Sequence, residues 1–137
     1  MSVKYEFASE EWVGQVRRIL LELSEGQDLS HIETIFCEKF TNPPRSLSSD
    51  GSPVGWYLKV SGGTLEVNSG IVDADFTVVA DYEFVLPLAR ATHAELAKNP
   101  PDAEEAATKM RREGDPSKVG SLTFMGPLHD LLVEVTV

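Results

Sequence analysis

The sequence predicts an α+β fold in which a mostly antiparallel, five-stranded sheet is covered on one face by helices. Three observations lead to this prediction. Segments that alternate apolar and polar residues lie mainly in the middle of the chain, segments with helical spacing lie before and after them, and glycines and prolines mark the boundaries. Helices gathered on one face of a largely antiparallel sheet form the layers of an α+β fold.

The length and the charge limit the classes of function. We expect the 137 residues to form a single domain over 1–137, because this length supports one core and is short for two. Lys and Arg number 12 against 22 Asp and Glu, so the formal net charge is −10. Nucleic acids and anionic membranes attract cationic surfaces, so we expect no nucleic-acid partner and no adsorption to an anionic membrane. The longest apolar runs are far shorter than the ~20 residues that a membrane span needs, so we expect no stable membrane insertion.

The start of the chain and the cysteine content indicate a location. The first residues lack the basic region followed by an apolar run that marks a secretory signal. Cys37 is the only cysteine, so no intrachain disulfide can form. We therefore expect a cytoplasmic protein.

The first helix is predicted over residues 9–25. Ser9 is a favourable N-cap, and the two glutamates after it suit the positive end of the helix dipole. Gly26 marks the end of the helix. The apolar residues at helical spacing are Trp12, Val16, Ile19, Leu20 and Leu23. This stripe predicts a helix that covers a flat apolar surface.

The first strand is predicted over residues 32–40, and one of its faces is mixed. Phe36, Glu38 and Phe40 share one parity, so a carboxylate stands between two aromatic residues. Prolines follow at once and remove ladder donors, which ends the strand. The segment 41–54 holds three prolines and four serines, and we expect it to be a mobile loop.

The next two strands form the clearest feature, a hairpin over 55–61 and 64–70. Both segments alternate strictly between apolar and polar residues. Gly62 and Gly63 stand between them, and glycine adopts the positive φ angles of a tight turn without steric penalty. A third alternating segment, 74–80, is predicted to add another strand.

After this strand the spacing becomes helical. Asp81 is a favourable cap, and Pro87 either stands in the first turn of the helix or kinks it. The predicted apolar stripe consists of Phe84, Val85, Leu88, Ala89, Thr92 and Leu96.

The last third of the chain is predicted to contain a helix, a strand and a closing helical segment. Asp102 caps a charged helix that runs to Gly114. Residues 117–124 are predicted to form the fifth strand. In the closing segment 127–137, Pro127 suits a first helical position.

Two stretches of this pattern resemble the sterol carrier protein 2 family. They are WYLKVSGGTLEVNSG over 56–70 and ADFTVVADYEFVLPL over 74–88. They are similar to the family's aromatic-led hairpin and to its strand that leads into an acidic-capped apolar helix. The stretch KVGSLTFM over 118–125 is similar to the end of the family pattern. The resemblance implies a cavity between sheet and helices that takes a fatty-acyl or sterol-like molecule, with no catalysis and no cofactor.

The ligand-lining residues that we expect lie on the later helices and on the closing segment. Phe84 and Leu88 belong to the apolar stripe, a methionine suits an adaptable surface, and the resemblance places the end of the chain against the ligand. The candidates are Phe84, Leu88, Met110, Phe124, Leu128, Leu131 and Leu132.

Two other functions stay open at this point. The same apolar faces could close on themselves, giving an interaction domain with a filled core, either homodimeric or accessory to an enzyme. An enzyme would need an ionisable group in the cavity, and His129 beside the final leucines is the candidate. His31, His93 and His129 show no metal-binding spacing, so we expect no metal site and no catalytic residue.

Overall fold

The computed structural model describes residues 3–137, and its centre is a five-stranded sheet with the order β3-β2-β1-β4-β5. The strands are β1 (Thr34–Thr41), β2 (Val54–Ser61), β3 (Thr64–Ser69), β4 (Phe76–Asp81) and β5 (Met110–Gly114). Three of the four pairings are antiparallel, and β1 pairs with β4 in parallel. The predicted fold class is confirmed, with one parallel pair in the sheet.

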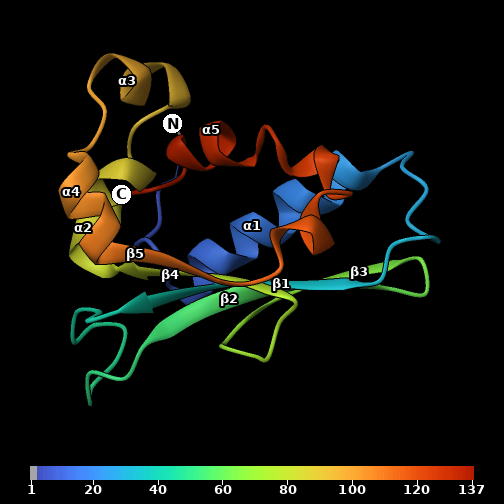
Figure 1. The fold of residues 1–137 in the computed structure, drawn as a ribbon, viewed down its shortest axis with the longest axis horizontal. Coiled ribbons are helices and arrows are strands. Elements are labelled where there is room, and N and C mark those ends of the chain that lie inside the picture. The colour runs from blue at the N-terminus through green and yellow to red at the C-terminus, as the bar shows by residue number, and fades with distance from the viewer. Residues whose placement is uncertain (1–2) are drawn as a thin grey trace.

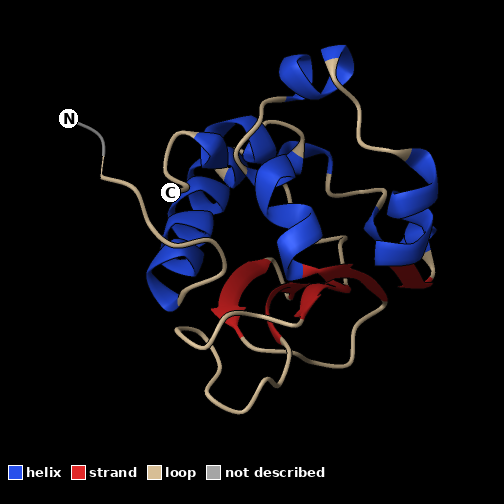
Figure 2. Ribbon diagram, turned by 90° about the vertical axis from the view of Figure 1, so that its left-hand side faces the viewer, coloured by secondary structure: helices blue, strands red, loops and turns tan. Residues whose placement is uncertain are grey.

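The helices lie on one face of this sheet, and loops cross the other face (Figures 1 and 2). The α-helices are α1 (Glu10–Ser24), α2 (Tyr82–Ala89), α3 (His93–Lys98), α4 (Ala103–Lys109) and α5 (Leu128–Val133), and the 3-10 helices are η1 (Pro116–Val119) and η2 (Thr123–Met125). None of the helices within residues 3–137 has the length and apolar character that a bilayer crossing requires.

Helix α1 begins and ends as the sequence predicts and buries its apolar stripe. The Ser9 side chain accepts a hydrogen bond from the Trp12 backbone N–H at 3.1 Å. The buried residues of this helix are Trp12, Val13, Val16, Ile19 and Leu20. The Arg17 Nε donates to the Val67 carbonyl at 2.7 Å, which ties the polar side of the helix to β3.

The two ends of the described chain pair with each other. Tyr5 and Thr136 form a parallel bridge. The Tyr5 N–H donates to the Val135 carbonyl at 2.7 Å, and the Val137 N–H donates to the Tyr5 carbonyl at 2.9 Å. The Trp12 indole N–H donates to the Thr136 hydroxyl at 2.9 Å. These bonds hold the N-terminal segment and α5 against α1.

The opposite face of the sheet is closed by the segment 70–75, which connects β3 to β4 below the sheet in Figure 1. Cys37 points to this face and is fully buried. Burial raises the pKa of its thiol, and a backbone hydrogen bond from Val72 of the covering segment lowers it to a smaller extent. An apolar, buried thiol with a raised pKa is unreactive.

Two sequence predictions in the last third of the chain were wrong. Residues 110–114 are not the end of a helix but form β5, because they pair with β4 at the edge of the sheet. In this pairing Ala80 lies opposite Met110 and Phe76 lies opposite Gly114. Such pairing overrides local preference. Residues 117–124 form no strand. The Asp115 side chain accepts the Ser117 N–H at 2.9 Å, and this turn, with Pro116, starts a 3-10 helix.

The apolar helix after β4 is also shorter than predicted. It ends at Ala89 with Pro87 inside it, and the chain restarts as α3. Thr92 and Glu95 form a capping box at this restart, with the Glu95 N–H donating to the Thr92 hydroxyl at 3.2 Å. The break turns the chain so that His93 approaches α5.

Candidate functional site

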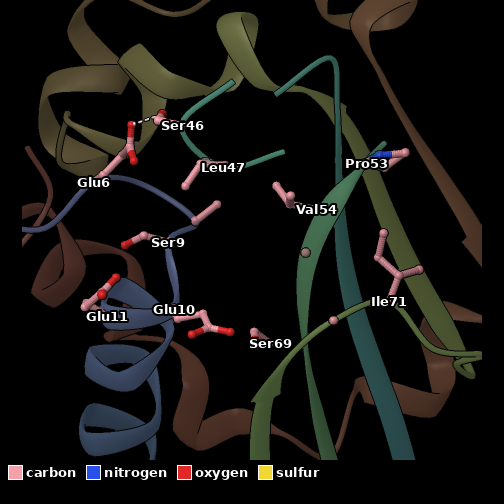
Figure 3. Close-up of a pocket in the computed structure, with 13 residues that line it drawn as sticks. Glu6, Ser9, Glu10, Glu11, Ser46, Leu47, Pro53, Val54, Ser69 and Ile71 are labelled. Carbon is pink, nitrogen blue, oxygen red and sulfur yellow. Dashed lines mark hydrogen bonds between the residues drawn. The ribbon is translucent and has the colours of Figure 1, made fainter. Parts of the chain in front are cut away.

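A cavity of about 500 Å³ lies where α1 begins, beside the ends of β2 and β3 (Figure 3). One wall carries Glu6, Glu10 and Glu11, and Glu6 accepts a hydrogen bond from the Ser46 hydroxyl at 2.8 Å. The lining has no basic side chain. A wall of three carboxylates is unsuited to an acyl chain, so this hollow does not match the expected ligand.

A second cavity, of about 280 Å³, lies between the sheet and its helices. Its lining comes from the N-terminal segment, α1, β1, α2, α3, η2 and α5. It consists of Phe7, Trp12, Glu38, Val85, Leu88, Ala89, His93, Met125, Gly126, Leu128, His129 and Leu132. Most of these groups are apolar, and a few polar groups stand among them. This is the usual composition of a small-molecule site, and we take this cavity as the candidate site.

The structure brings three of the seven predicted ligand residues to this cavity. Leu88 comes from α2, and Leu128 and Leu132 come from α5. The other four lie elsewhere. Phe124 is buried in the core, Phe84 is half-buried outside the lining, Met110 faces a shallow hollow beside α4, and Leu131 is 38% exposed.

Glu38 is the residue that sequence reasoning missed as a site residue. It stands on the central strand, between β2 and β4, on the face that the helices cover. Burial raises its pKa to about 7, and the neighbouring Trp56 indole lowers it by a smaller amount. The mixed parity of the first strand was the available signal, because a carboxylate between Phe36 and Phe40 is unusual on an apolar face.

The carboxylate of Glu38 has unused hydrogen-bonding capacity. Trp56 is its register partner on β2, and the Trp56 indole is the one hydrogen-bonding neighbour that influences the pKa. The Trp56 Nε1 nevertheless has no partner with hydrogen-bond geometry among residues 3–137. A buried, unpaired indole N–H therefore lies beside a half-buried carboxylate that reaches the cavity.

The solvent end of the cavity carries two histidines. The rings of His93 and His129 are stacked with centroids 4.6 Å apart. His93 Nδ1 lies 3.3 Å from a carboxylate oxygen of Asp130, and its backbone N–H donates to the same oxygen at 2.8 Å. His129 Nε2 lies 2.7 Å from the Ala91 carbonyl oxygen.

This cluster was not visible in the sequence, because His93 and His129 are far apart in the chain. One ligand atom from each of His93, His129 and Asp130 lies within 4.8 Å of the others, which is close enough to hold a metal ion. His129 Nε2 is occupied by the Ala91 carbonyl, so only the Nδ1 of that ring is free for such an ion.

No protein-family model matches the sequence, and no curated protein matches it significantly. Among solved structures, a conserved hypothetical protein of Thermus thermophilus, suggested to be a sterol carrier protein, has a TM-score of 0.56 at 18% identity, over 99% of this chain and 96% of that one. A crystal structure of sterol carrier protein 2 has a TM-score of 0.51 at 18% identity, over 96% of this chain and 100% of that one. The architecture, the predicted pattern and these two matches agree: the chain has the sterol carrier protein 2-like fold.

Proposed function

We propose that this protein binds an apolar small molecule, of the acyl-chain or similarly apolar class, in the cavity between α2, α5 and the sheet, and that it does so without catalysing a reaction. The observation that carries the proposal is the cavity itself. It measures about 280 Å³ and lies where the fold layers meet, with mostly apolar walls.

The energetics support an occupied cavity. Apolar space that is left empty inside a protein costs stability, on the order of 24 cal/mol per Å³ where it is fully enclosed. A ligand that fills the inner part of this cavity makes contacts with its apolar walls that the empty protein lacks.

The volume sets the size of the buried part of the ligand. A share of about 30 Å³ per small group, as for water in the liquid, gives room for roughly nine non-hydrogen atoms. A longer chain therefore has to extend through the opening beside His93 and His129.

The test is native mass spectrometry of gently purified protein, followed by solvent extraction of the same sample. We expect a bound apolar species that is released on unfolding. Ala89→Phe fills the cavity and should remove the species, whereas Ala97→Phe, at an exposed position of α3, should retain it. The same spectrum shows whether the chain is a monomer or the homodimer considered above.

An empty wild-type chain that also fails to bind added acyl compounds would overturn the proposal. The interaction domain with a filled core would then be the better interpretation. The exposed large apolar side chains within residues 3–137 that would serve such a role are Val3, Leu21, Ile71, Leu131 and Val137.

A further inference from the structure

We propose that the ligand of this cavity is a medium-chain aliphatic alcohol. Its hydroxyl group enters first and donates a hydrogen bond to the carboxylate of Glu38. This inference rests on the proposed function and names the chemical class of the ligand. Four properties of the cavity carry it, namely the position of Glu38, its lack of a partner, the charge of the lining and the volume.

Glu38 forms the inner end of the cavity. β1 is the central strand of the sheet, so β2 and β4 flank Glu38 on both sides, and residues of α1, α2 and α5 line the same cavity. The part of its side chain that stays accessible is the part that lines the cavity. His93 lies at the other end and is exposed. A ligand that enters past the histidines therefore meets the carboxylate last.

The Glu38 carboxylate is half-buried and faces the cavity, with the Trp56 indole as its one polar neighbour, and this placement on an apolar face needs an explanation. Burying a polar group without a hydrogen bond costs several kcal/mol, and replacing buried ionic groups by apolar ones is often stabilising. Phe36 and Phe40 on the same face show that this strand otherwise places aromatic residues there. An apolar residue at position 38 would serve a plain core better. A ligand group that donates to the carboxylate supplies the missing partner.

The lining selects against charged head groups. None of the lining residues is Lys or Arg, and both lining histidines lie at the solvent end, so a ligand carboxylate placed beside Glu38 would have no cation next to it. A ligand ammonium would form an ion pair, but both charges would lose their water, which offsets much of the attraction. A hydroxyl loses one water hydrogen bond and regains it from Glu38. The neutral donor is therefore the head group that the cavity fits best.

The volume selects the chain length. Room for roughly nine non-hydrogen atoms, at about 30 Å³ each, matches the size of 1-octanol. The apolar side chains of Val85, Leu88 and Leu132 then surround the alkyl chain along its length. The terminal methyl group lies toward the histidines.

The experiment compares three probes of equal chain length: 1-octanol, octanoate and octylamine. Trp12 lines the cavity, so its fluorescence reports binding, and calorimetry gives the Kd independently. We expect 1-octanol to bind most tightly. Glu38→Leu should weaken 1-octanol binding about ten- to a hundredfold, the range expected for a hydrogen bond to a charged group. Glu38→Gln keeps an acceptor but not the charge, so its affinity for 1-octanol should lie between those of the wild type and Glu38→Leu.

Glu66→Leu is the matched control, because it makes the same change at an exposed position of β3. Thermal unfolding of each variant verifies that it folds. Tighter binding of octanoate or octylamine than of 1-octanol, or an unchanged 1-octanol affinity in Glu38→Leu, would overturn this inference while the apolar binding function stands. Failure of all three probes to bind the wild-type protein would overturn both.

Discussion

Glu38 and Cys37 are neighbours on the central strand and face opposite sides of the sheet. The two sides differ in whether a ligand can reach the buried ionisable group. Burial raises the pKa of both groups. Cys37 is buried under the segment 70–75 and is not part of the lining of the candidate cavity. Glu38 stands at the inner end of a cavity that opens beside His93. A perturbed ionisable group therefore indicates a site only where a ligand can reach it.

The largest expected effect concerns the cost of ionising Glu38. Its folded pKa of about 7 lies above the ordinary 4.5, so the folded state binds the proton more tightly than the unfolded state. The stabilisation is complete below pH 4.5 and is lost as the pH rises through 7. At about 1.4 kcal/mol per pH unit, the loss is on the order of 3 kcal/mol.

Denaturant unfolding at about pH 5 and about pH 8, on either side of the folded pKa, tests this with Glu38→Gln as the reference. The free energy of unfolding of the wild type should fall relative to that of the variant as the pH rises. All other titrating groups are common to both proteins and cancel in the difference. A difference that does not depend on pH would show that Glu38 is not desolvated.

The second effect concerns the close packing of the sheet face that the segment 70–75 covers, the face of Cys37. Gly55 pairs with Lys39, and a Cβ at position 55 would lie 2.2 Å from the Glu38 carbonyl oxygen and 3.2 Å from the Ile71 side chain. Gly55→Ala should lower the free energy of unfolding by about 2–3 kcal/mol through overpacking. Gly14→Ala is the control, because a Cβ there meets nothing within 4 Å. Equal stability of the two variants would contradict the close approach of the strands.

The third effect concerns the hydrogen bonds between the two ends of the described chain, which lie on the same side of the sheet as the cavity. Thr136→Val removes the hydroxyl that accepts the Trp12 indole N–H and donates to the Leu132 carbonyl at 2.7 Å. Leaving the buried indole N–H unpaired should cost about 1–2 kcal/mol. Chemical denaturation followed by tryptophan fluorescence measures it. Thr136→Ser keeps the hydroxyl and should retain most of the stability.

The smallest effect is expected at Cys37. Its raised pKa and full burial predict that a thiol reagent labels it only when the protein opens. Labelling at neutral pH should be slow in the native protein and rapid in denaturant. Rapid native labelling would show that the segment 70–75 does not seal this face, and the contrast with Glu38 would disappear.

The parts of the fold that the sequence predicted are those whose signals are local. The cap at Ser9, the alternation of the hairpin and the turn at Gly62 and Gly63 each depend on residues close in the chain. β5 depends on pairing with β4, and its exposed, polar residues carry no alternation. Propensity alone could not distinguish it from the end of a helix.

The site was only partly predictable for a similar reason. Leu88, Leu128 and Leu132 lie at helical spacing in the apolar segments of the chain, so their burial against the sheet could be expected. Glu38 was visible as an irregularity of the first strand, but its role depends on α2 and α5, which lie far along the chain and close above it. The pairing of His93 with His129 needs the break after α2, which only the folded chain shows.

The bridge between Tyr5 and Thr136 has a consequence for how the protein is assembled. Phe7 follows Tyr5 of this bridge and Leu132 precedes Thr136, so the first and last parts of the described chain both line one cavity. Contacts between such distant residues carry a large loop-closure entropy and favour late formation in folding. We therefore expect the sheet to form before this cavity closes, so that the capacity to hold a ligand is gained late in folding and lost early when the chain ends separate.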